Sequence, residues 1–398
     1  MTDLGLGLLR HGYQAIDHDR AERDGGAAYQ TRLLGRRAVV LGGETGARFF
    51  YNENLVERRG AVPPPLAWLL FGRGAVHGLD EDAHRERKQL FLDQLAPGQV
   101  AQVAESVGGQ LKAAIISWAG REVVVYDELV EVFGSAVLTW VGVDLSDEEQ
   151  RRLSHRYAAI IDGFGFAGSA YLRAWAARRA TDAWARNVIT EVRGGRIKAA
   201  EGTVLSAVAS SDLDNKTAGV ELGNIIRPTV AVAWLGTHAV LALAEADQTW
   251  HAQLANPEAD TLRWAFAQEV RRTTPFVPAL AGRARCDTTH KGISIRAGNR
   301  VILDVRGIIL DPTHFEDPLV FRPDRFIDLE PNAYELVPQG GGPPTGHRCP
   351  GESLTLQLLA HTIAIFAETD FTIVSPRDVD PSRIPTLPPQ GLRIRVEN

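Results

Sequence analysis

Apolar residues recur at intervals of three and four through the middle of the chain, from about residue 82 to residue 275. This spacing lines one face of an α-helix and predicts a helix-rich body. The apolar run at 217–246 is the longest, and it predicts a helix that crosses the core. The other helices expected in this region span residues 83–95, 98–118, 129–141, 149–161 and 171–193.

Shorter segments at the two ends of the chain predict β-strands. Residues 28–41 have the pattern of two strands around a turn, and a helix is expected to begin near Glu44. An irregular, proline-rich run at 311–350 leads to a further helix at 353–367. Additional strands are expected at 284–287, 293–296, 301–304, 371–374 and 392–396. These elements favour a mainly α, α+β fold in one domain that spans residues 1–398.

Composition narrows the class of protein. The 398 residues are 44% hydrophobic and 23% charged, which is typical of a globular protein with a sizeable core. A net charge of −6 argues against nucleic acid as a partner. The apolar stretch at the N-terminus is too short for a signal peptide, and we expect neither a membrane anchor nor a transmembrane span. Two distant cysteines favour a reducing cytoplasm over a disulfide, and Cys286 is expected to lie in a strand without a special role.

The other cysteine, Cys349, lies in a glycine- and proline-rich loop that leads directly into the helix expected at 353–367. Backbone N–H groups at a helix N-terminus favour the thiolate, which can act as a nucleophile or a metal ligand. A buried structural thiol is the commoner fate of a free cysteine. A zinc site is less favoured because no second cysteine lies at metal-binding spacing. A cysteine protease is less favoured because it needs a partner histidine that the sequence does not reveal.

The run His347-Arg348-Cys349-Pro350-Gly351-Glu352 resembles the haem-ligand loop of the cytochrome P-450 superfamily. Three further motifs resemble that family in the same order along the chain: a Glu-x-x-Arg pair, a strand after Pro275, and the Phe-Arg-Pro-Asp-Arg-Phe run. The resemblance implies a cytochrome P-450 fold with haem b between the long core helix and the helix after Cys349. Cys349 would ligate the iron. The cofactor would also contact His84, Lys88, Arg283 and Arg348, while Glu269, Arg272 and Arg325 would form a structural clamp behind the haem.

The long helix contains Arg227-Pro228, where most members of the family carry an acid–alcohol pair. Proline removes one helical hydrogen bond, so a kink is expected. An arginine that faces the core needs a negative partner, and an internal salt bridge or a solvent-facing position are the alternatives. Arg227-Pro228 resembles the fatty-acid peroxygenase branch of the family, in which the arginine binds the substrate carboxylate. Arg227 and Pro228 are therefore candidate catalytic residues.

Residues 70–80, which we call the roof loop, resemble a second feature of that branch. The resemblance places Phe71 and His77 in the substrate pocket and gives His77 a catalytic role, although a surface histidine is the competing interpretation. Phe276 is a further candidate for substrate binding. Together with Trp68, Trp234 and His238, it is a candidate for narrowing the pocket.

The resemblance implies oxidation of a carboxylic acid, in particular a fatty acid, by hydrogen peroxide. The products would be α- or β-hydroxy acids or terminal alkenes, and the substrate carboxylate on Arg227 would act as acid and base. A redox partner would not be required. The alternatives are a monooxygenase that depends on redox partners and acts on another small molecule, and a non-catalytic haem protein that senses or carries a ligand.

Overall fold

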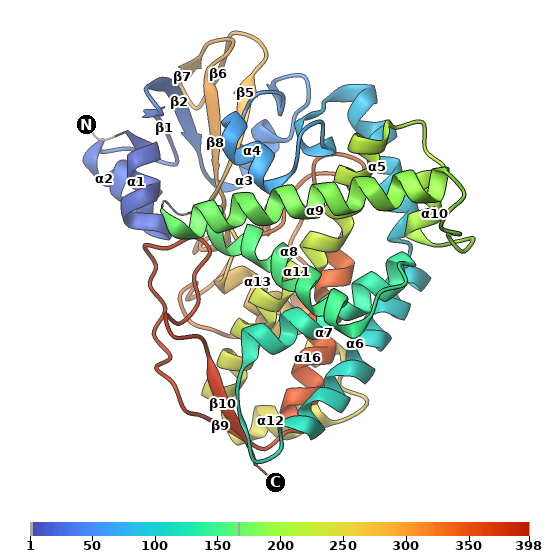
Figure 1. The fold of residues 1–398 in the computed structure, drawn as a ribbon. Helices are drawn as coiled ribbons and strands as arrows, with labels where there is room; N and C mark the ends of the chain where they lie inside the picture. The colour runs from blue at the N-terminus through green and yellow to red at the C-terminus, as the bar shows by residue number, and fades with distance from the viewer. Residues whose placement is uncertain (1–2, 166–167, 398) are drawn as a thin grey trace.

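The computed structural model describes residues 3–165 and 168–397. Its helical body surrounds α11 (Asn215–Glu245), which runs through the centre and packs against α9 (Ser169–Arg193), α7 (Val125–Val141) and α16 (Glu352–Ala367) (Figure 1). α6 (Pro97–Trp118) covers α16 and α7 on the far side from α9. The other helices are α1 (Leu4–His11), α2 (Ala15–Glu22), α3 (Gly43–Phe50), α4 (Pro64–Leu70), α5 (Glu81–Gln94), α8 (Asp147–Gly163), α10 (Val204–Ala209), α12 (Gln248–Ala255), α13 (Asp260–Thr273), α14 (Val305–Ile309) and α15 (Arg325–Asp328), with single 3₁₀ turns η1 (Gly12–Gln14) and η2 (Val76–Gly78).

A side-chain cap marks the start of the central helix α11. Asp214 caps α11, because its Oδ1 accepts hydrogen bonds from the amides of Lys216 (2.9 Å) and Thr217 (3.1 Å). The helix continues through Pro228 without a break. By length and composition α11 could cross a membrane, but 78% of its most apolar stretch is buried inside the protein. It is therefore a core helix, as the apolar pattern predicts.

The β-strands lie at two opposite ends of the helical body (Figure 1). A five-stranded sheet has the order β1 (Ala28–Leu33), β2 (Arg36–Leu41), β8 (Arg300–Asp304), β5 (Ala279–Ala284) and β3 (Val56–Glu57). Its one parallel pair, β2 with β8, joins the N-terminal hairpin to a strand from the far half of the chain. A second sheet has the order β4 (Glu122–Val124), β10 (Arg393–Val396) and β9 (Phe371–Ile373), and β6 (Thr288–His290) pairs with β7 (Ile293–Ile295). The strands β1, β2, β5, β6, β7 and β8 lie at one end of the helical body, whereas β9 and β10 lie at the opposite end, beside α12 (Figure 1).

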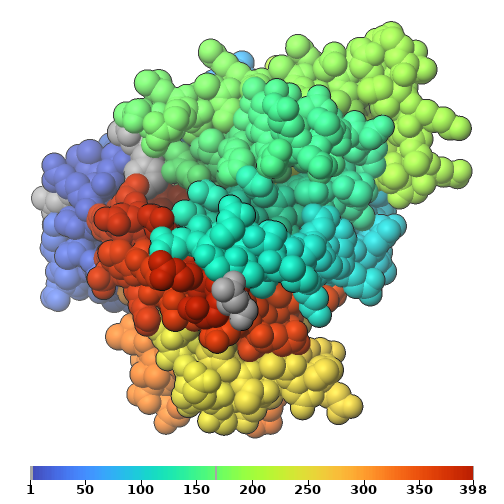
Figure 2. Space-filling view, turned by 60° about the horizontal axis from the view of Figure 1, so that its bottom comes forward, coloured from blue at the N-terminus to red at the C-terminus, as the bar shows by residue number. Residues whose placement is uncertain are grey.

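The C-terminal segment holds distant parts of the chain together. Figure 2 shows it lying between the N-terminal helices and the middle of the chain. Strand β10 pairs with β4, and the Tyr13 amide donates a hydrogen bond to the Pro381 carbonyl at 2.8 Å. The Tyr13 hydroxyl also donates to the Phe276 carbonyl at 3.1 Å, so the N-terminal helices are fastened to the segment that follows α13.

The expected elements are present with small shifts at their ends, apart from one strand. The strand expected at 284–287 is instead β5, which ends at Ala284. Its sequence, Ala-Leu-Ala-Gly-Arg-Ala, has no β-branched residue and carries little strand signal by itself. It forms because it pairs with β8 on one side and β3 on the other. Cys286 consequently lies outside the strand and is exposed, which corrects its expected position.

Close contact between α7 and α8 depends on a glycine. A Cβ atom at Gly134 would lie 1.9 Å from the Ser154 hydroxyl, which donates to the Gln150 carbonyl at 2.7 Å. We expect Gly134→Ala to destabilise the protein by about 1–3 kcal/mol, because the extra methyl group forces the helices apart. Gly109→Ala on the exposed side of α6 is the control, since a Cβ there meets nothing within 4 Å and alanine favours the helix. Thermal unfolding of both variants measures the difference, and equal midpoints would contradict this packing.

Candidate active site

One face of α11 presents a buried guanidinium to the interior. Arg227 is 6% exposed, and its Nη2 donates a hydrogen bond to Asn224 Oδ1 at 3.1 Å. Its Nε is buried without a hydrogen-bond partner, and no carboxylate among the described residues forms an ion pair with it. Burial, together with the charge of nearby Arg178, lowers the pKa of Arg227 to about 9, so the side chain stays cationic at neutral pH. This is a fixed positive charge that lacks an anionic partner.

Two further buried donors lie in the electrostatic environment of Arg227. Tyr157 on α8 is 1% exposed and Arg178 on α9 is 2% exposed, and the Tyr157 hydroxyl and Arg178 Nη1 have no hydrogen-bond partner. Arg178 is ion-paired with Asp182 through its other nitrogen atoms. The surroundings of Arg227 are therefore rich in donors and poor in acceptors, which favours an anionic ligand.

The roof loop brings Phe71 and His77 together. Their rings stack with centroids 4.2 Å apart and an interplanar angle of 13°, and the Arg227 guanidinium carbon lies 5.9 Å from the centre of the Phe71 ring. Burial, followed by the charge of Arg227, lowers the pKa of His77 to about 3, although the ring carries accessible surface. The ring is thus neutral at neutral pH and lies beside Phe71, within reach of the charge of Arg227. A place for His77 in the substrate pocket stays a prediction.

Cys349 lies just before α16, and Gln339 contacts both its amide and its sulfur. The Cys349 amide donates to the Gln339 carbonyl at 3.0 Å, and Gln339 Nε2 lies 3.9 Å from Sγ. Burial raises the pKa of the Cys349 thiol, while the Gly351 amide and the charges of Lys88 and Arg271 oppose that rise. The thiol also contributes to the electrostatic environment of Arg227. The sulfur is thus near enough for its charge to act on the Arg227 guanidinium.

A second cationic group borders the Cys349 loop. The Lys88 ammonium is buried and donates to the Gly346 and Arg348 carbonyls, and burial lowers its pKa to about 8. His84 is also buried, lies against His347 with ring centres 3.9 Å apart and planes tilted by 30°, and has an Nδ1 without a hydrogen-bond partner. The structure therefore brings His84 and Lys88 to the Cys349 loop, beside Arg348, as expected from the sequence.

Arg283 does not join this group. It lies on the exposed side of β5 and pairs with Glu57, with Nε and Oε1 3.4 Å apart. The strand places Gly282 and Ala284 inward, so the alternation of side chains carries Arg283 outward. Arg58 is the better candidate. It lies 4.0 Å from the centre of the Phe50 ring and has a buried Nη1 without a hydrogen-bond partner.

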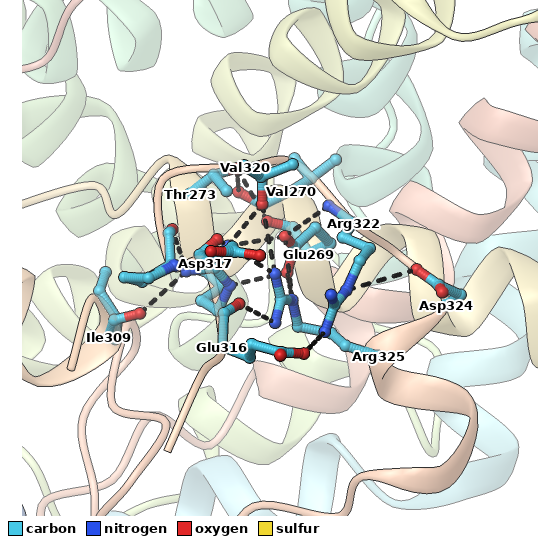
Figure 3. A network of polar contacts seen from close by, with 12 residues as sticks. Glu269, Val270, Thr273, Ile309, Glu316, Asp317, Val320, Arg322, Asp324 and Arg325 are labelled. Atoms are coloured by element: carbon cyan, nitrogen blue, oxygen red, sulfur yellow. Dashed lines mark hydrogen bonds and ion pairs between the residues drawn. The ribbon is translucent and has the colours of Figure 1, made fainter. Parts of the chain in front are cut away.

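One carboxylate on α13, that of Glu269, joins two buried arginines (Figure 3). Glu269 and Arg272 are both fully buried and form a two-point ion pair, with distances of 2.6 and 2.7 Å. Arg325 Nε lies 3.3 Å from the same carboxylate, and Arg272 also donates to the carbonyls of Ile309 and Pro318. The three residues predicted as a clamp thus meet, and they fix the irregular run at 311–325 to α13.

An adjacent ion-pair network fixes the start of α16. Glu352 accepts a hydrogen bond from Arg271 Nη2 at 2.6 Å and from Arg348 Nε at 2.6 Å. The Arg348 side chain is 28% exposed and turns towards Glu352. Arg348 is therefore committed to this network, and its backbone carbonyl contacts Lys88.

Aromatic side chains form one wall of the interior. Phe276 lies 5.5 Å from Trp234 on α11 and 5.6 Å from Phe164 at the end of α8, measured between ring centres. Trp234 and His238 both contact the Thr386 carbonyl, at 2.8 and 3.0 Å. Trp68 is not part of this wall, because it is exposed on α4 and Arg73 lies over its ring at 4.0 Å.

Comparison with known proteins now identifies the family. A family model described as Cytochrome P450 matches residues 262–392, which include the Glu269 clamp and Cys349. The structure of cytochrome P450SP alpha (CYP152B1) in complex with (R)-ibuprofen is similar over 99% of this chain and 98% of that chain, with 34% identity and a TM-score of 0.93. The chain belongs to the cytochrome P450 family.

Two other relatives extend the comparison. A variant of cytochrome P450 OleT in complex with arachidonic acid is 32% identical, with a TM-score of 0.92 over 99% of this cytochrome P450 and 96% of that chain. Abscisic acid 8'-hydroxylase 2 of Oryza sativa subsp. indica is 23% identical over 412 residues, which cover 93% of this chain and 79% of the relative. The structural matches place this cytochrome P450 in the branch of P450SP alpha and OleT.

A cytochrome P450 carries haem whose iron is ligated by a cysteine thiolate. The residues of this chain fit that cofactor. Cys349 is half-buried and would supply the sulfur ligand. Buried donors of His84 and Arg58 lack partners, and the Lys88 ammonium contacts only carbonyl groups in the part of the chain that is described. These cationic and donor groups suit the two propionates of haem, which are anionic.

Some residues of the site are not predicted by any sequence motif. Arg58 lies far from Cys349 in the sequence and no motif marks it. Glu221 and Asn224 precede Arg227 by six and three positions, so all three share one side of α11. That spacing is a signal that could have found them, because buried polar residues one turn apart on a core helix commonly hydrogen-bond to each other.

The clamp gives a direct test of buried ion pairing. Glu269→Ala leaves Arg272 and Arg325 buried without their carboxylate, which is expected to cost about 3–5 kcal/mol of stability. Glu316→Ala removes an exposed carboxylate that pairs with Arg322 at 3.1 Å, and its cost should stay below about 1 kcal/mol. Thermal unfolding and the amount of bound haem measure both effects. Similar losses of stability and haem in the two variants would show that the buried clamp contributes no more than an exposed ion pair.

Proposed function

We propose that this cytochrome P450 oxidises a carboxylic acid, with fatty acids as the substrate class and hydrogen peroxide as the oxidant. The observation that carries the proposal is the buried Arg227 guanidinium, which forms no ion pair with a carboxylate among the described residues. A guanidinium matches a carboxylate with two parallel hydrogen bonds. Arachidonic acid and ibuprofen, the ligands named for the two similar structures, both carry a carboxylate.

The substrate carboxylate would also supply missing acid–base chemistry. Bound haem supplies a thiolate-ligated iron at which peroxide is activated. One proton must then move between the two peroxide oxygens, and Arg227 cannot carry it because it remains cationic. Two other groups on α11 are committed: the Thr229 hydroxyl donates to the Ile225 carbonyl at 3.0 Å, and Glu221 accepts hydrogen bonds from Arg87, Val76 and Asn224. A carboxylate held by Arg227 is then the available acid and base.

The overall reactions balance without an external electron donor. Hydroxylation converts the acid and one peroxide into a hydroxy acid and water. Decarboxylation converts the acid and one peroxide into a terminal alkene, carbon dioxide and two waters. The redox partner is dispensable in both, because peroxide supplies the oxygen and the oxidising equivalents together. Binding through the carboxylate places Cα and Cβ nearest the reacting centre, so these carbons are the expected positions of attack.

A monooxygenase that depends on redox partners is the second candidate, because the relatives of 23–24% identity include hydroxylases. Incubation of the haem-loaded protein with acids of several lengths separates the two functions. Peroxide alone should give products identified by mass spectrometry. Turnover only with NADPH and surrogate electron-transfer proteins would favour the second function.

Arg227→Leu should weaken acid binding by about 100-fold, because it removes a charged two-point hydrogen bond worth about 3 kcal/mol. Acid-induced change of the haem spin state measures binding, and peroxide-driven turnover should fall in parallel. Arg186→Leu on the exposed side of α9 is a matched control that should bind acid like the wild type. Acid binding and turnover that survive in Arg227→Leu would contradict the proposal.

His77 is proposed to influence the choice between hydroxylation and decarboxylation. Its ring is neutral and stacked on Phe71, so it can accept or donate one hydrogen bond close to the carboxylate. His77→Gln should shift the products by at least twofold towards hydroxy acid, because glutamine loses the stacking that fixes the hydrogen-bonding atom. His155→Gln on the surface is the control. An unchanged product ratio measured by gas chromatography would remove His77 from this role.

A further inference from the structure

A fully buried carboxylate on α11 connects Arg227 with the roof loop. Glu221 is 0% exposed and lies two turns before Arg227. Its Oε1 accepts hydrogen bonds from the Val76 amide at 2.9 Å and from Arg87 Nη1 at 2.7 Å. Its Oε2 accepts a hydrogen bond from Asn224 Nδ2 at 2.9 Å. One carboxylate therefore contacts α5, the roof loop and the next polar residue of its own helix.

Asn224 connects Glu221 to the Arg227 guanidinium through its side-chain amide. Its Nδ2 donates to Glu221 Oε2 and also to the Phe71 carbonyl at 3.0 Å, while its Oδ1 accepts from Arg227 Nη2 at 3.1 Å. The two acceptors on one side and the donor on the other admit a single orientation of the amide. The orientation of Asn224 is thus set by Glu221 and the Phe71 carbonyl, and it decides whether Arg227 meets an acceptor or a donor.

We propose that Glu221 is a positioning residue for acid binding, which fixes the Asn224 amide and thereby the direction in which Arg227 presents its guanidinium beside the roof loop. The inference rests on the proposed function, because it concerns the site at which Arg227 would bind a carboxylate. Glu221 itself does not touch the substrate. It acts through Asn224 on one side and through the Val76 amide, next to His77, on the other.

A structural ion pair with Arg87 alone does not account for these contacts. Arg87 occupies only Oε1, which it shares with the Val76 amide, and its side chain is 18% exposed. Oε2 is directed to Asn224, a residue buried to 4% exposure whose remaining hydrogen bonds go to Phe71 and Arg227. Oε2 therefore connects Glu221 to Asn224 and, through Asn224, to Arg227.

Glu221→Gln tests the idea with almost no change of shape. Glutamine has one acceptor oxygen, which the Val76 amide and Arg87 will claim, and its NH₂ group then opposes the NH₂ group of Asn224. Rotation of the Asn224 amide relieves that clash. The rotation turns a donor towards Arg227 and leaves the Phe71 carbonyl without its donor. The variant thus disturbs Arg227 from two turns away on the helix.

The measurement is binding of a fatty acid and of imidazole to the haem-loaded protein, followed by visible spectroscopy. Imidazole binds iron without a carboxylate, so it reports the state of the haem and the pocket independently of Arg227. We expect Glu221→Gln to weaken acid binding about tenfold and to leave imidazole binding within twofold of wild type. Glu128→Gln is the matched control, since Glu128 is a half-buried carboxylate that accepts from Trp118 Nε1 at 3.0 Å. It should leave both affinities unchanged.

A double-mutant cycle shows whether the effect passes through Asn224. Asn224→Leu should weaken acid binding as much as Glu221→Gln, and the double variant should lose no more than either single variant. Additive losses, equal loss of imidazole binding, or wild-type acid affinity in Glu221→Gln would each overturn the inference. If wild-type protein itself fails to bind the acid, the proposed function has failed and the role of Glu221 fails with it. Loss in Arg227→Leu but not in Glu221→Gln removes the role of Glu221 alone.

Discussion

An uncompensated positive charge in the core is the constraint on which the site depends. Burial of an unpaired guanidinium is unfavourable, and proteins normally place a carboxylate beside it. Around Arg227 the fold supplies the Asn224 oxygen, the face of Phe71 and further donors, but no carboxylate among the described residues forms an ion pair with it. A ligand that brings its own negative charge relieves this cost. Under the proposed function, the same charge would select acids, set their direction and hold the carboxylate that moves a proton.

Two networks of ion pairs hold the segments on either side of Cys349 in place. Glu269 neutralises Arg272 and holds Arg325, and Glu352 does the same for Arg271 and Arg348. These pairs fix the irregular run before Cys349 and the first turn of α16, so the sulfur has a defined position. The arginines of these two networks thus have carboxylate partners, whereas Arg227 forms no ion pair among the described residues.

The parts of the fold and site that could be predicted are those determined by residues close together in the sequence. The loop around Cys349, the Glu269–Arg272 spacing and the periodicity of α11 each lie within a few helical turns. Arg283 was misplaced because the phase of β5 is set by pairing with β8 and β3, not by its own residues. Arg58, and the contacts of Glu221 with Val76 and Arg87, connect residues far apart in the sequence, which no local pattern records. The exposure of Trp68 likewise follows from how α4 packs.

The most direct test compares one fatty acid with its primary amide, which has nearly the same shape and no charge. Both are titrated into the haem-loaded wild-type protein, and the spin state of the iron and peroxide-driven turnover are followed. If Arg227 recruits its missing anion from the substrate, the acid changes the spin state and is oxidised, while the amide does neither at comparable concentration. Equal binding and turnover of the amide would show that the buried charge does not govern this site.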